Sequence, residues 1–172
     1  APRLARPFID LDARIEARAG TSIAEIFRSA GEEEFRRLEA LVLEEACDHA
    51  PAVVALGGGA VVRERAWRRM REAGVTVRLH APPYELLRRI RESGRPLASR
   101  PLLAEGDPAE RLARLVAERE QWYARADLHL DTTALTAEEV AGAIVGLLRT
   151  IEGPLVPLAG GAGRGSPTVN AP

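Results

Sequence analysis

Short apolar runs alternate with segments of helical period along this chain, and that alternation limits what the chain can fold into. The runs rich in strand-forming residues lie at 7–11, 52–59, 75–81 and 128–132. The segments with apolar residues at spacings of three and four lie at 31–47, 63–73, 83–93, 108–124 and 136–151. Strands that alternate with helices at this spacing predict an α/β fold, with a parallel sheet covered by helices on both faces.

Local signals at the helix ends support this assignment. Gly74 follows the helix predicted at 63–73, and Pro108 stands at a first helical position, where its missing N–H costs nothing. Thr136 and Glu139 have the spacing of a capping box at the start of the last helix. These helices are therefore predicted with defined ends.

Composition excludes several classes of protein. A net charge of −1 gives no general attraction to nucleic acid or to an anionic membrane, and no apolar run is long enough to span a membrane. The single cysteine, Cys47, cannot form an internal disulfide. We expect a cytoplasmic monomer with one domain at 1–151 and a disordered Gly/Pro-rich tail at 152–172.

Two carboxylates, Asp10 and Asp12, end the first apolar run. Side chains alternate along a strand, so both would project from one face, with Leu11 on the other. The carboxyl ends of the strands form the site in an open parallel sheet. One carboxylate there could hold Mg²⁺, often through water, and the other could accept a proton from a substrate hydroxyl. The alternative is a solvated turn at the end of a strand.

A glycine triplet and two arginines are further candidates for a binding site. The triplet at 57–59 leaves backbone N–H groups open to a ligand, or else it forms a sharp turn. Arg36 and Arg119 could each bind a carboxylate through two parallel hydrogen bonds, or each could lie solvated on the surface. The proline-containing segment 93–110 is typical of a lid, with a plain surface loop as the alternative.

Six motifs occur in a fixed order from about Pro7 to about Leu148. They are "FIDLDARIE", "GTSIAEIF", "GEEEFRRLE", "LGGGAVV", "SRPLL" and "REQWYARADLHLDT". Together they resemble the motifs of the shikimate kinase family. The resemblance implies a P-loop domain of the nucleoside-monophosphate-kinase type, with a substrate subdomain at about 12–47 and a lid at about 94–108. It also implies phosphorylation of the 3-hydroxyl of shikimate by ATP and Mg²⁺, in aromatic amino acid biosynthesis.

The resemblance also assigns roles to single residues. Asp12 would contact shikimate and act as the catalytic base, and Asp10 would lie near the magnesium ion. Arg36 and Arg119 would hold the shikimate carboxylate, and Gly58 would contact shikimate through its backbone. The remaining implied residues are the aromatic walls of the shikimate site, Phe27 and Phe35, and the lid residue that reaches the ATP phosphates, Arg100.

One part of the family pattern is not found in this sequence. The family opens with a strand and the loop G-x-x-G-x-G-K-[ST], whereas six residues precede Pro7 here and the chain contains no lysine. Because that loop carries most of the grip on phosphate, we expect this chain to be an incomplete form. It would lack the central first strand, bind shikimate weakly and turn over no ATP.

The tail contains glycines with a similar spacing, at positions 160, 163 and 165. A circularly permuted kinase would use them as its loop. However, Ser166 stands where lysine belongs, and Pro167 stands where the loop's Ser or Thr belongs. We expect no phosphate site in the tail.

Three functions remain open. The first is a shikimate kinase, and the second is a non-catalytic, shikimate-kinase-like module that binds a ligand or regulates. A different sugar or gluconate kinase is disfavoured by the placement of Arg36 and Arg119. The presence of Asp12 and Arg100 together with the acid-binding pair favours the first function, because a binding module has no use for a catalytic base.

Overall fold

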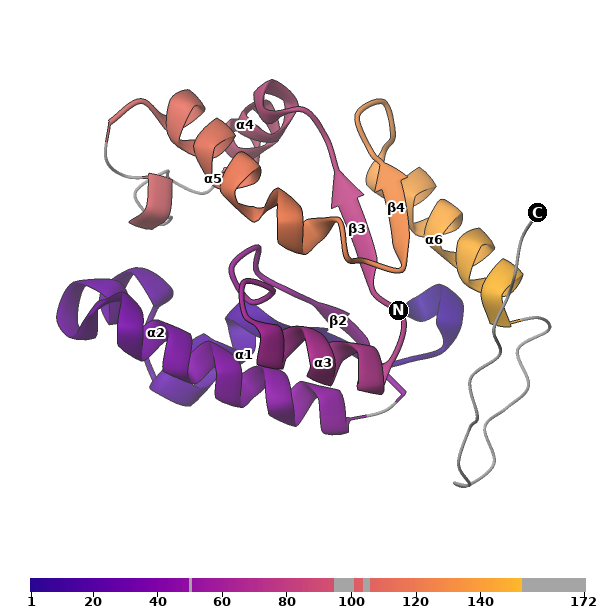
Figure 1. The fold of residues 1–172 in the computed structure, drawn as a ribbon, viewed down its shortest axis with the longest axis horizontal. Helices are drawn as coiled ribbons and strands as arrows, with labels where there is room; N and C mark the ends of the chain where they lie inside the picture. The colour runs from indigo at the N-terminus through magenta and orange to yellow at the C-terminus, as the bar shows by residue number, and fades with distance from the viewer. Residues whose placement is uncertain (50, 95–100, 104–105, 153–172) are drawn as a thin grey trace.

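The computed structural model describes residues 1–49, 51–94, 101–103 and 106–152 (Figure 1). Its strands are β1 (Phe8–Asp10), β2 (Val53–Ala55), β3 (Val77–His80) and β4 (Leu128–Asp131). Its α-helices are α1 (Leu11–Ala19), α2 (Ile23–Asp48), α3 (Glu64–Ala73), α4 (Pro83–Glu92), α5 (Pro108–Tyr123) and α6 (Ala137–Glu152). Short 3-10 helices, η1 (Pro2–Leu4) and η3 (Pro101–Leu103), complete the elements discussed below.

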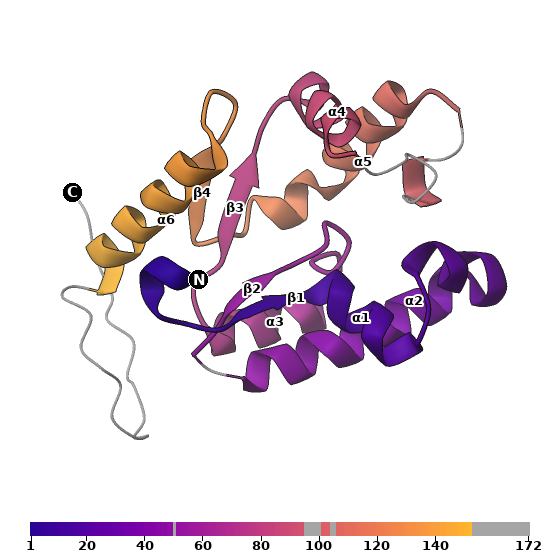
Figure 2. The same cartoon turned by 180° about the vertical axis from the view of Figure 1, so that it is seen from behind.

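The strands form two parallel pairs. β1 pairs with β2 from Phe8↔Val53 onward, and β3 pairs with β4 from Val77↔Leu128 onward. Within the described ranges, β2 and β3 each pair with a single strand, so the two pairs lie beside one another without forming one sheet (Figures 1 and 2). The predicted α/β class with parallel strands is confirmed, whereas the four strands do not join into a continuous sheet.

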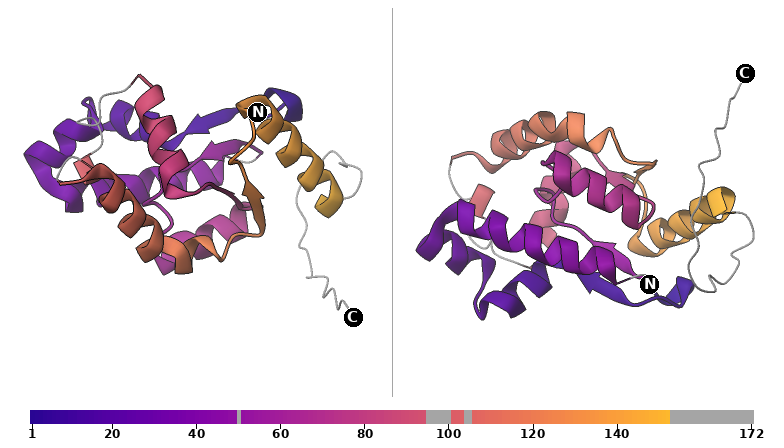
Figure 3. Two further views of the ribbon diagram at one scale, coloured as in Figure 1. Left: turned by 90° about the horizontal axis from the view of Figure 1, so that it is seen from above. Right: turned by 60° about the horizontal axis from the view of Figure 1, so that its bottom comes forward.

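The main hydrophobic core lies between the β1–β2 pair and the helices α1, α2 and α3. Leu11 and Ile15, four residues apart on one face of α1, are both completely buried. Each such side chain stabilises the fold by about 1.5–3 kcal/mol. The shorter helix α1 packs against part of the longer helix α2 (Figure 3). The other buried hydrophobic residues of this core are Ile9, Ile26, Phe35, Leu38, Val42, Leu43, Ala46, Ala60, Val61, Trp67 and Met70.

The helix α1 is not among the helices that the sequence pattern predicted. Asp10 is the N-cap of α1, and its Oδ1 accepts a hydrogen bond from the Ala13 N–H at 3.3 Å. Asp12 therefore lies in the first turn of a helix, and the expectation that it extends the strand is wrong. Leu11 is still buried while Asp10 and Asp12 are exposed, because Leu11 belongs to the apolar face of α1.

The second helix is broken near its start. Ser22 caps α2, with its Oγ accepting from the Glu25 N–H at 3.2 Å, and the part of α2 that follows Gly31 corresponds to the helix predicted at 31–47, whereas the part that begins at Ile23 was not predicted. Gly31 interrupts the helix with φ 80° and ψ 175°. Residues other than glycine are strained in that region by about 1–3 kcal/mol. Gly31 thus allows the two parts of α2 to adopt different directions.

The predicted helix ends are confirmed. Thr136 and Glu139 form the capping box of α6, with Thr136 N–H to Glu139 Oε2 at 2.8 Å and Glu139 N–H to Thr136 Oγ1 at 3.3 Å. Pro108 begins α5, and Gly74 closes α3. None of the described helices combines the length and apolar character needed to cross a membrane.

A buried carboxylate ties α4 to the ends of β3 and β4. Glu85 accepts hydrogen bonds from Arg88 at 2.7 and 2.8 Å and from Arg89 Nε at 2.7 Å. Arg89 also donates to Thr132 Oγ1 at 2.9 Å, and the Thr132 hydroxyl donates to the His80 carbonyl at 3.0 Å. The two hydrogen bonds from Arg88, followed by the one from Arg89, lower the pKa of Glu85 to about 2.

Glu85→Gln is expected to lower the free energy of unfolding at neutral pH. The difference from the unmodified protein should become smaller as the pH falls. The pKa of Glu85 is depressed in the folded state from 4.5 to about 2. Its stabilising contribution is therefore present above pH 4.5 and is lost as the pH falls toward 2. Urea unfolding at pH 7, 5, 4 and 3 measures this as a difference in free energy between the two proteins. The control is Glu92→Gln on the same helix, whose side chain is exposed; a pH-independent difference for Glu85→Gln would contradict the assignment.

Candidate active site

The glycine triplet 57–59 begins two residues after the last residue of β2, at the carboxyl end of the β1–β2 pair. A Cβ atom placed on each glycine shows which groups lie against the loop. At Gly57 that Cβ would lie 3.0 Å from Asp12 Oδ1 and 3.7 Å from Glu39 Oε1. The carboxylate in the first turn of α1 therefore lies against the backbone of the loop.

Two guanidinium groups approach the same loop from other helices. A Cβ on Gly58 would lie 3.3 Å from Arg119 Nη1 of α5, and one on Gly59 would lie 2.8 Å from Arg36 Cζ of α2. The second distance is shorter than real Cβ contacts, so residue 59 must be glycine for Arg36 to keep this position. The structure thus brings Asp12, Arg36 and Arg119 together around the glycine triplet.

Arg36 is held in place by carboxylates of its own helix. Its Nη1 donates to Glu39 Oε2 at 2.7 Å, and its Nε and Nη2 donate to Glu32 Oε1 at 3.2 and 3.0 Å. The guanidinium also lies 5.1 Å from the centre of the Phe35 ring. Burial lowers the pKa of Arg36, but its bonds to Glu39 and Glu32 outweigh burial and raise the pKa above its ordinary value. Arg36 is therefore a permanent cation with a fixed orientation.

Glu39 is a site residue that the sequence reasoning missed. It is only 5 % exposed, and burial raises the pKa of its carboxyl above the ordinary value. The bond from Arg36 acts in the opposite direction without cancelling the effect of burial, and the charge of Asp12 raises the pKa further. The spacing of three residues from Arg36 on a helix was the signal that could have identified it.

The two predicted aromatic residues pair with each other. The rings of Phe27 and Phe35 have centroids 4.8 Å apart and planes inclined at 40°. They belong to the two parts of α2 on either side of Gly31, so the break in the helix brings them into contact. Since Phe35 also contacts Arg36, the aromatic pair adjoins the charged groups of the site.

Of the residues predicted to bind the metal ion and the nucleotide, the structure describes Asp10 but not Arg100. Asp10 lies at the carboxyl end of β1, where its cap to α1 engages one of its two carboxylate oxygens. No cluster of three potential metal-ligating side chains occurs among the residues that are described. Arg100 and most of the predicted lid lie outside the described residues, as does all but the first residue of the predicted tail.

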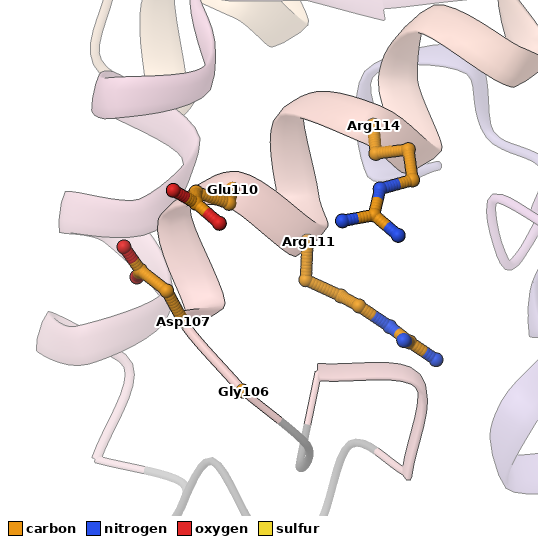
Figure 4. A pocket seen from close by; sticks show the side chains of 5 residues that line it. All are labelled: Gly106, Asp107, Glu110, Arg111 and Arg114. Atoms are coloured by element: carbon orange, nitrogen blue, oxygen red, sulfur yellow. The ribbon is translucent and has the colours of Figure 1, made fainter.

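A cavity of about 290 Å³ lies elsewhere, at the start of α5 (Figure 4). Its lining residues are Gly106, Asp107, Glu110, Arg111 and Arg114. Figure 4 shows the two carboxylates on one side of the helix and the two guanidinium groups on the other. None of the residues around the glycine triplet lines this cavity, so it is separate from the constellation described above.

Comparison with known proteins identifies the family. The family model for shikimate kinase matches residues 1–149. The chain is 43% identical over 148 residues to the shikimate kinase of Geobacter metallireducens, covering 86% of this chain and 80% of the relative. It is 42% identical over 148 residues to the shikimate kinase of Nitrobacter winogradskyi, covering 86% of this chain and 67% of the relative.

Solved structures give the same result. The shikimate kinase of Acinetobacter baumannii, solved in complex with shikimate, superposes with a TM-score of 0.80 at 31% identity and covers 88% of this chain and 83% of its own. The shikimate kinase of Aquifex aeolicus superposes with a TM-score of 0.71 at 31% identity, covering 88% and 87%. The resemblance seen in the six ordered motifs is confirmed, and the chain belongs to the shikimate kinase family.

Proposed function

We propose that this chain carries the shikimate site of a shikimate kinase, which transfers the terminal phosphate of ATP to the 3-hydroxyl of shikimate. Membership of the family supports the reaction. One observation of the structure carries the site: Asp12, Arg36 and Arg119, from three different helices, all lie against one glycine triplet.

The chemistry of the ligand fits these groups. Shikimate has one carboxylate and three hydroxyls, so it needs cations at one end and a hydrogen-bond acceptor at the reacting hydroxyl. Arg36 and Arg119 supply two guanidinium groups, which bind carboxylates through paired hydrogen bonds. Gly58 would contact the ring through its backbone, and Phe27 and Phe35 would form an apolar wall beside it.

Asp12 would act as the general base. The 3-hydroxyl oxygen forms a bond to the γ-phosphorus of ATP, the bond from that phosphorus to the β–γ bridging oxygen breaks, and ADP leaves. The hydroxyl proton passes to the Asp12 carboxylate. Exposure of Asp12 in the first turn of α1 leaves it accessible to a substrate at the carboxyl ends of β1 and β2.

Asp10 is compatible with a magnesium ion. Mg²⁺ is commonly held by one or two carboxylates together with water and substrate phosphates, and the cap to α1 uses only one oxygen of Asp10. The ion would neutralise charge on the ATP phosphates. Arg100 would add a cation on the nucleotide side.

Gly59→Ala is expected to weaken shikimate binding by about tenfold or more without unfolding the protein. The new Cβ would displace the Arg36 guanidinium, and a hydrogen bond to a charged group contributes about 1.5–3 kcal/mol. Isothermal titration of shikimate into the 172-residue chain measures the affinity, and circular dichroism checks the fold.

Gly74→Ala is the matched control, because a Cβ at Gly74 meets nothing within 4 Å and its backbone is extended. The control should bind shikimate like the unmodified chain. Equal affinities for all three proteins would contradict the assigned site, and an unmodified chain that binds no shikimate would contradict the proposed function.

A further inference from the structure

A single side-chain hydrogen bond links the glycine triplet to α5. The Tyr123 hydroxyl donates to the Gly58 carbonyl at 3.0 Å, between residues 65 positions apart in the chain. The loop that carries the triplet rises from β2 toward α5 in both views of the fold (Figures 1 and 2). The hydroxyl thus fixes the peptide group at the centre of the triplet.

The same face of α5 carries Arg119, one helical turn before Tyr123. A Cβ on Gly58 would lie 2.8 Å from the Tyr123 hydroxyl and 3.3 Å from Arg119 Nη1. Residues four apart on a helix keep a constant separation, so a bond between Tyr123 and the loop also fixes the loop relative to Arg119.

The Tyr123 ring is held independently of its hydroxyl. The Arg78 guanidinium lies 5.5 Å from the centre of the ring, and Arg78 forms two bonds to Glu120, at 2.7 and 2.6 Å. Tyr123 also packs against the main hydrophobic core. Phenylalanine at this position would therefore retain the ring and its packing and lose only the bond to Gly58.

The chain just beyond α5 is anchored to α3. Arg125 forms two bonds to Glu64, at 2.7 and 3.0 Å, and its guanidinium lies 5.3 Å from the Trp67 ring and 5.4 Å from the Trp122 ring. This contact holds the end of α5 close to the element that follows the glycine loop. Because α5 is already held by this contact, the bond from the Tyr123 hydroxyl to Gly58 mainly fixes the position of the loop.

We propose that Tyr123 is a positioning residue for substrate binding: its hydroxyl sets the glycine triplet at the distance from Arg119 that a bound shikimate requires. The proposal rests on the proposed function. Tyr123 does not touch the reacting atoms; it acts through the Gly58 peptide. When the Tyr123 hydroxyl is absent, the bound ligand itself must hold the loop in position relative to the two arginines. The free energy that this ordering costs lowers the affinity for shikimate.

Tyr123→Phe tests this, with Tyr84→Phe as the control. Tyr84 is the other tyrosine of the chain and is 68% exposed on α4. Titration calorimetry should show that Tyr123→Phe weakens shikimate binding about two- to tenfold, the effect of one hydrogen bond, while Tyr84→Phe leaves it unchanged. The thermal midpoints of both variants should match, because the exposed Gly58 carbonyl can accept a hydrogen bond from water.

Amide hydrogen exchange provides a measurement that needs no ligand. The loop contains turn hydrogen bonds from Ala60 N–H to the Gly57 carbonyl at 3.1 Å and from Val62 N–H to the Gly59 carbonyl at 3.2 Å. Exchange at 57–62 should be about two- to tenfold faster in Tyr123→Phe than in Tyr84→Phe.

Equal exchange in the two variants would overturn the proposal. So would faster exchange with unchanged shikimate affinity, because the bond would then order the loop without serving the ligand. If the thermal midpoint of Tyr123→Phe falls together with the shikimate affinity, the hydroxyl stabilises the fold as a whole and has no specific role in binding. If the unmodified chain binds no shikimate, the proposed function fails, and the exchange comparison alone decides whether Tyr123 places the loop.

Discussion

Replacing Asp12 by asparagine is expected to lower ATP turnover by roughly two to four powers of ten, the usual effect of losing a general base, with little loss of shikimate affinity. The measurement uses this chain with the family's phosphate-binding loop joined ahead of Ala1, in a coupled assay of ADP release. Shikimate affinity is measured in parallel by calorimetry.

The separation between turnover and affinity follows from the position of Asp12. Its Oδ1 lies against the backbone of Gly57, in the first turn of α1. Asparagine has the same shape and can still accept a hydrogen bond from the substrate hydroxyl through its amide oxygen. It cannot take up the proton that must leave the hydroxyl, so only the chemical step suffers.

Asp48→Asn is a suitable control, since Asp48 lies at the far end of α2 and pairs with Arg69. It should keep normal turnover. Near-normal turnover of Asp12→Asn would show that Asp12 is not the base. Normal binding without turnover in the unmodified, loop-joined protein would instead favour the non-catalytic module.

Replacing Arg119 by alanine is expected to weaken shikimate binding by roughly ten- to a hundredfold, because a hydrogen bond to a charged group contributes about 1.5–3 kcal/mol. Within the described ranges Arg119 has no ion pair of its own, unlike Arg36. Its removal therefore leaves no buried carboxylate without a partner, and the loss measures the ligand contact itself. Turnover at saturating shikimate should change much less than affinity.

Arg114→Ala removes the same charge from the same helix, five residues earlier, where the side chain lines the separate cavity at the start of α5. Calorimetry of both variants distinguishes a specific contact from a general loss of positive charge. Equal affinities in the two variants would show that Arg119 does not hold the carboxylate.

The helices and strands were predictable where the apolar pattern was strong. The segments 63–73, 83–93, 108–124 and 136–151 all correspond to helices of the structure within one or two residues. Their apolar faces and end signals agree with the packing, so local preference and tertiary structure point the same way. The four strands were likewise found in the expected runs, although each is shorter than its run.

The start of the chain was harder to predict because α1 is short and mostly polar. It buries only Leu11 and Ile15, and two apolar residues are too few to distinguish a helix from the end of a strand. The beginning of α2 was also missed, although Ser22 and Glu25 have the spacing of a helix N-cap and Ser22 Oγ accepts from the Glu25 N–H. The break at Gly31 was not predictable, since glycine is tolerated inside helices as well as at their interruptions.

The family resemblance selected Asp12, Arg36, Gly58 and Arg119, and the structure places these residues around one loop; their roles stay predictions. Glu39 and Tyr123 could not be selected in that way. Their importance lies in the group that each contacts, Arg36 for one and the Gly58 carbonyl for the other. The Glu39 pairing could have been inferred only from its spacing of three residues from Arg36 on a helix, whereas the Tyr123 pairing joins residues 65 positions apart and depends on three-dimensional distance.

The carboxylates that hold Arg36 also affect how a ligand approaches the glycine triplet. The side chains of Arg36 and Arg119 and the carboxylates of Asp12, Glu32 and Glu39 together have a net charge of −1 when Glu39 is ionised and of zero when it is protonated. A nearly neutral cluster gives little electrostatic attraction to an anion that is farther away than a Debye length, which is about 8 Å at physiological ionic strength. We therefore expect association rates that hardly change with ionic strength, and little capture of simple anions. Capture then depends on short-range contacts, which only a molecule carrying both an acid group and correctly placed hydroxyls can make.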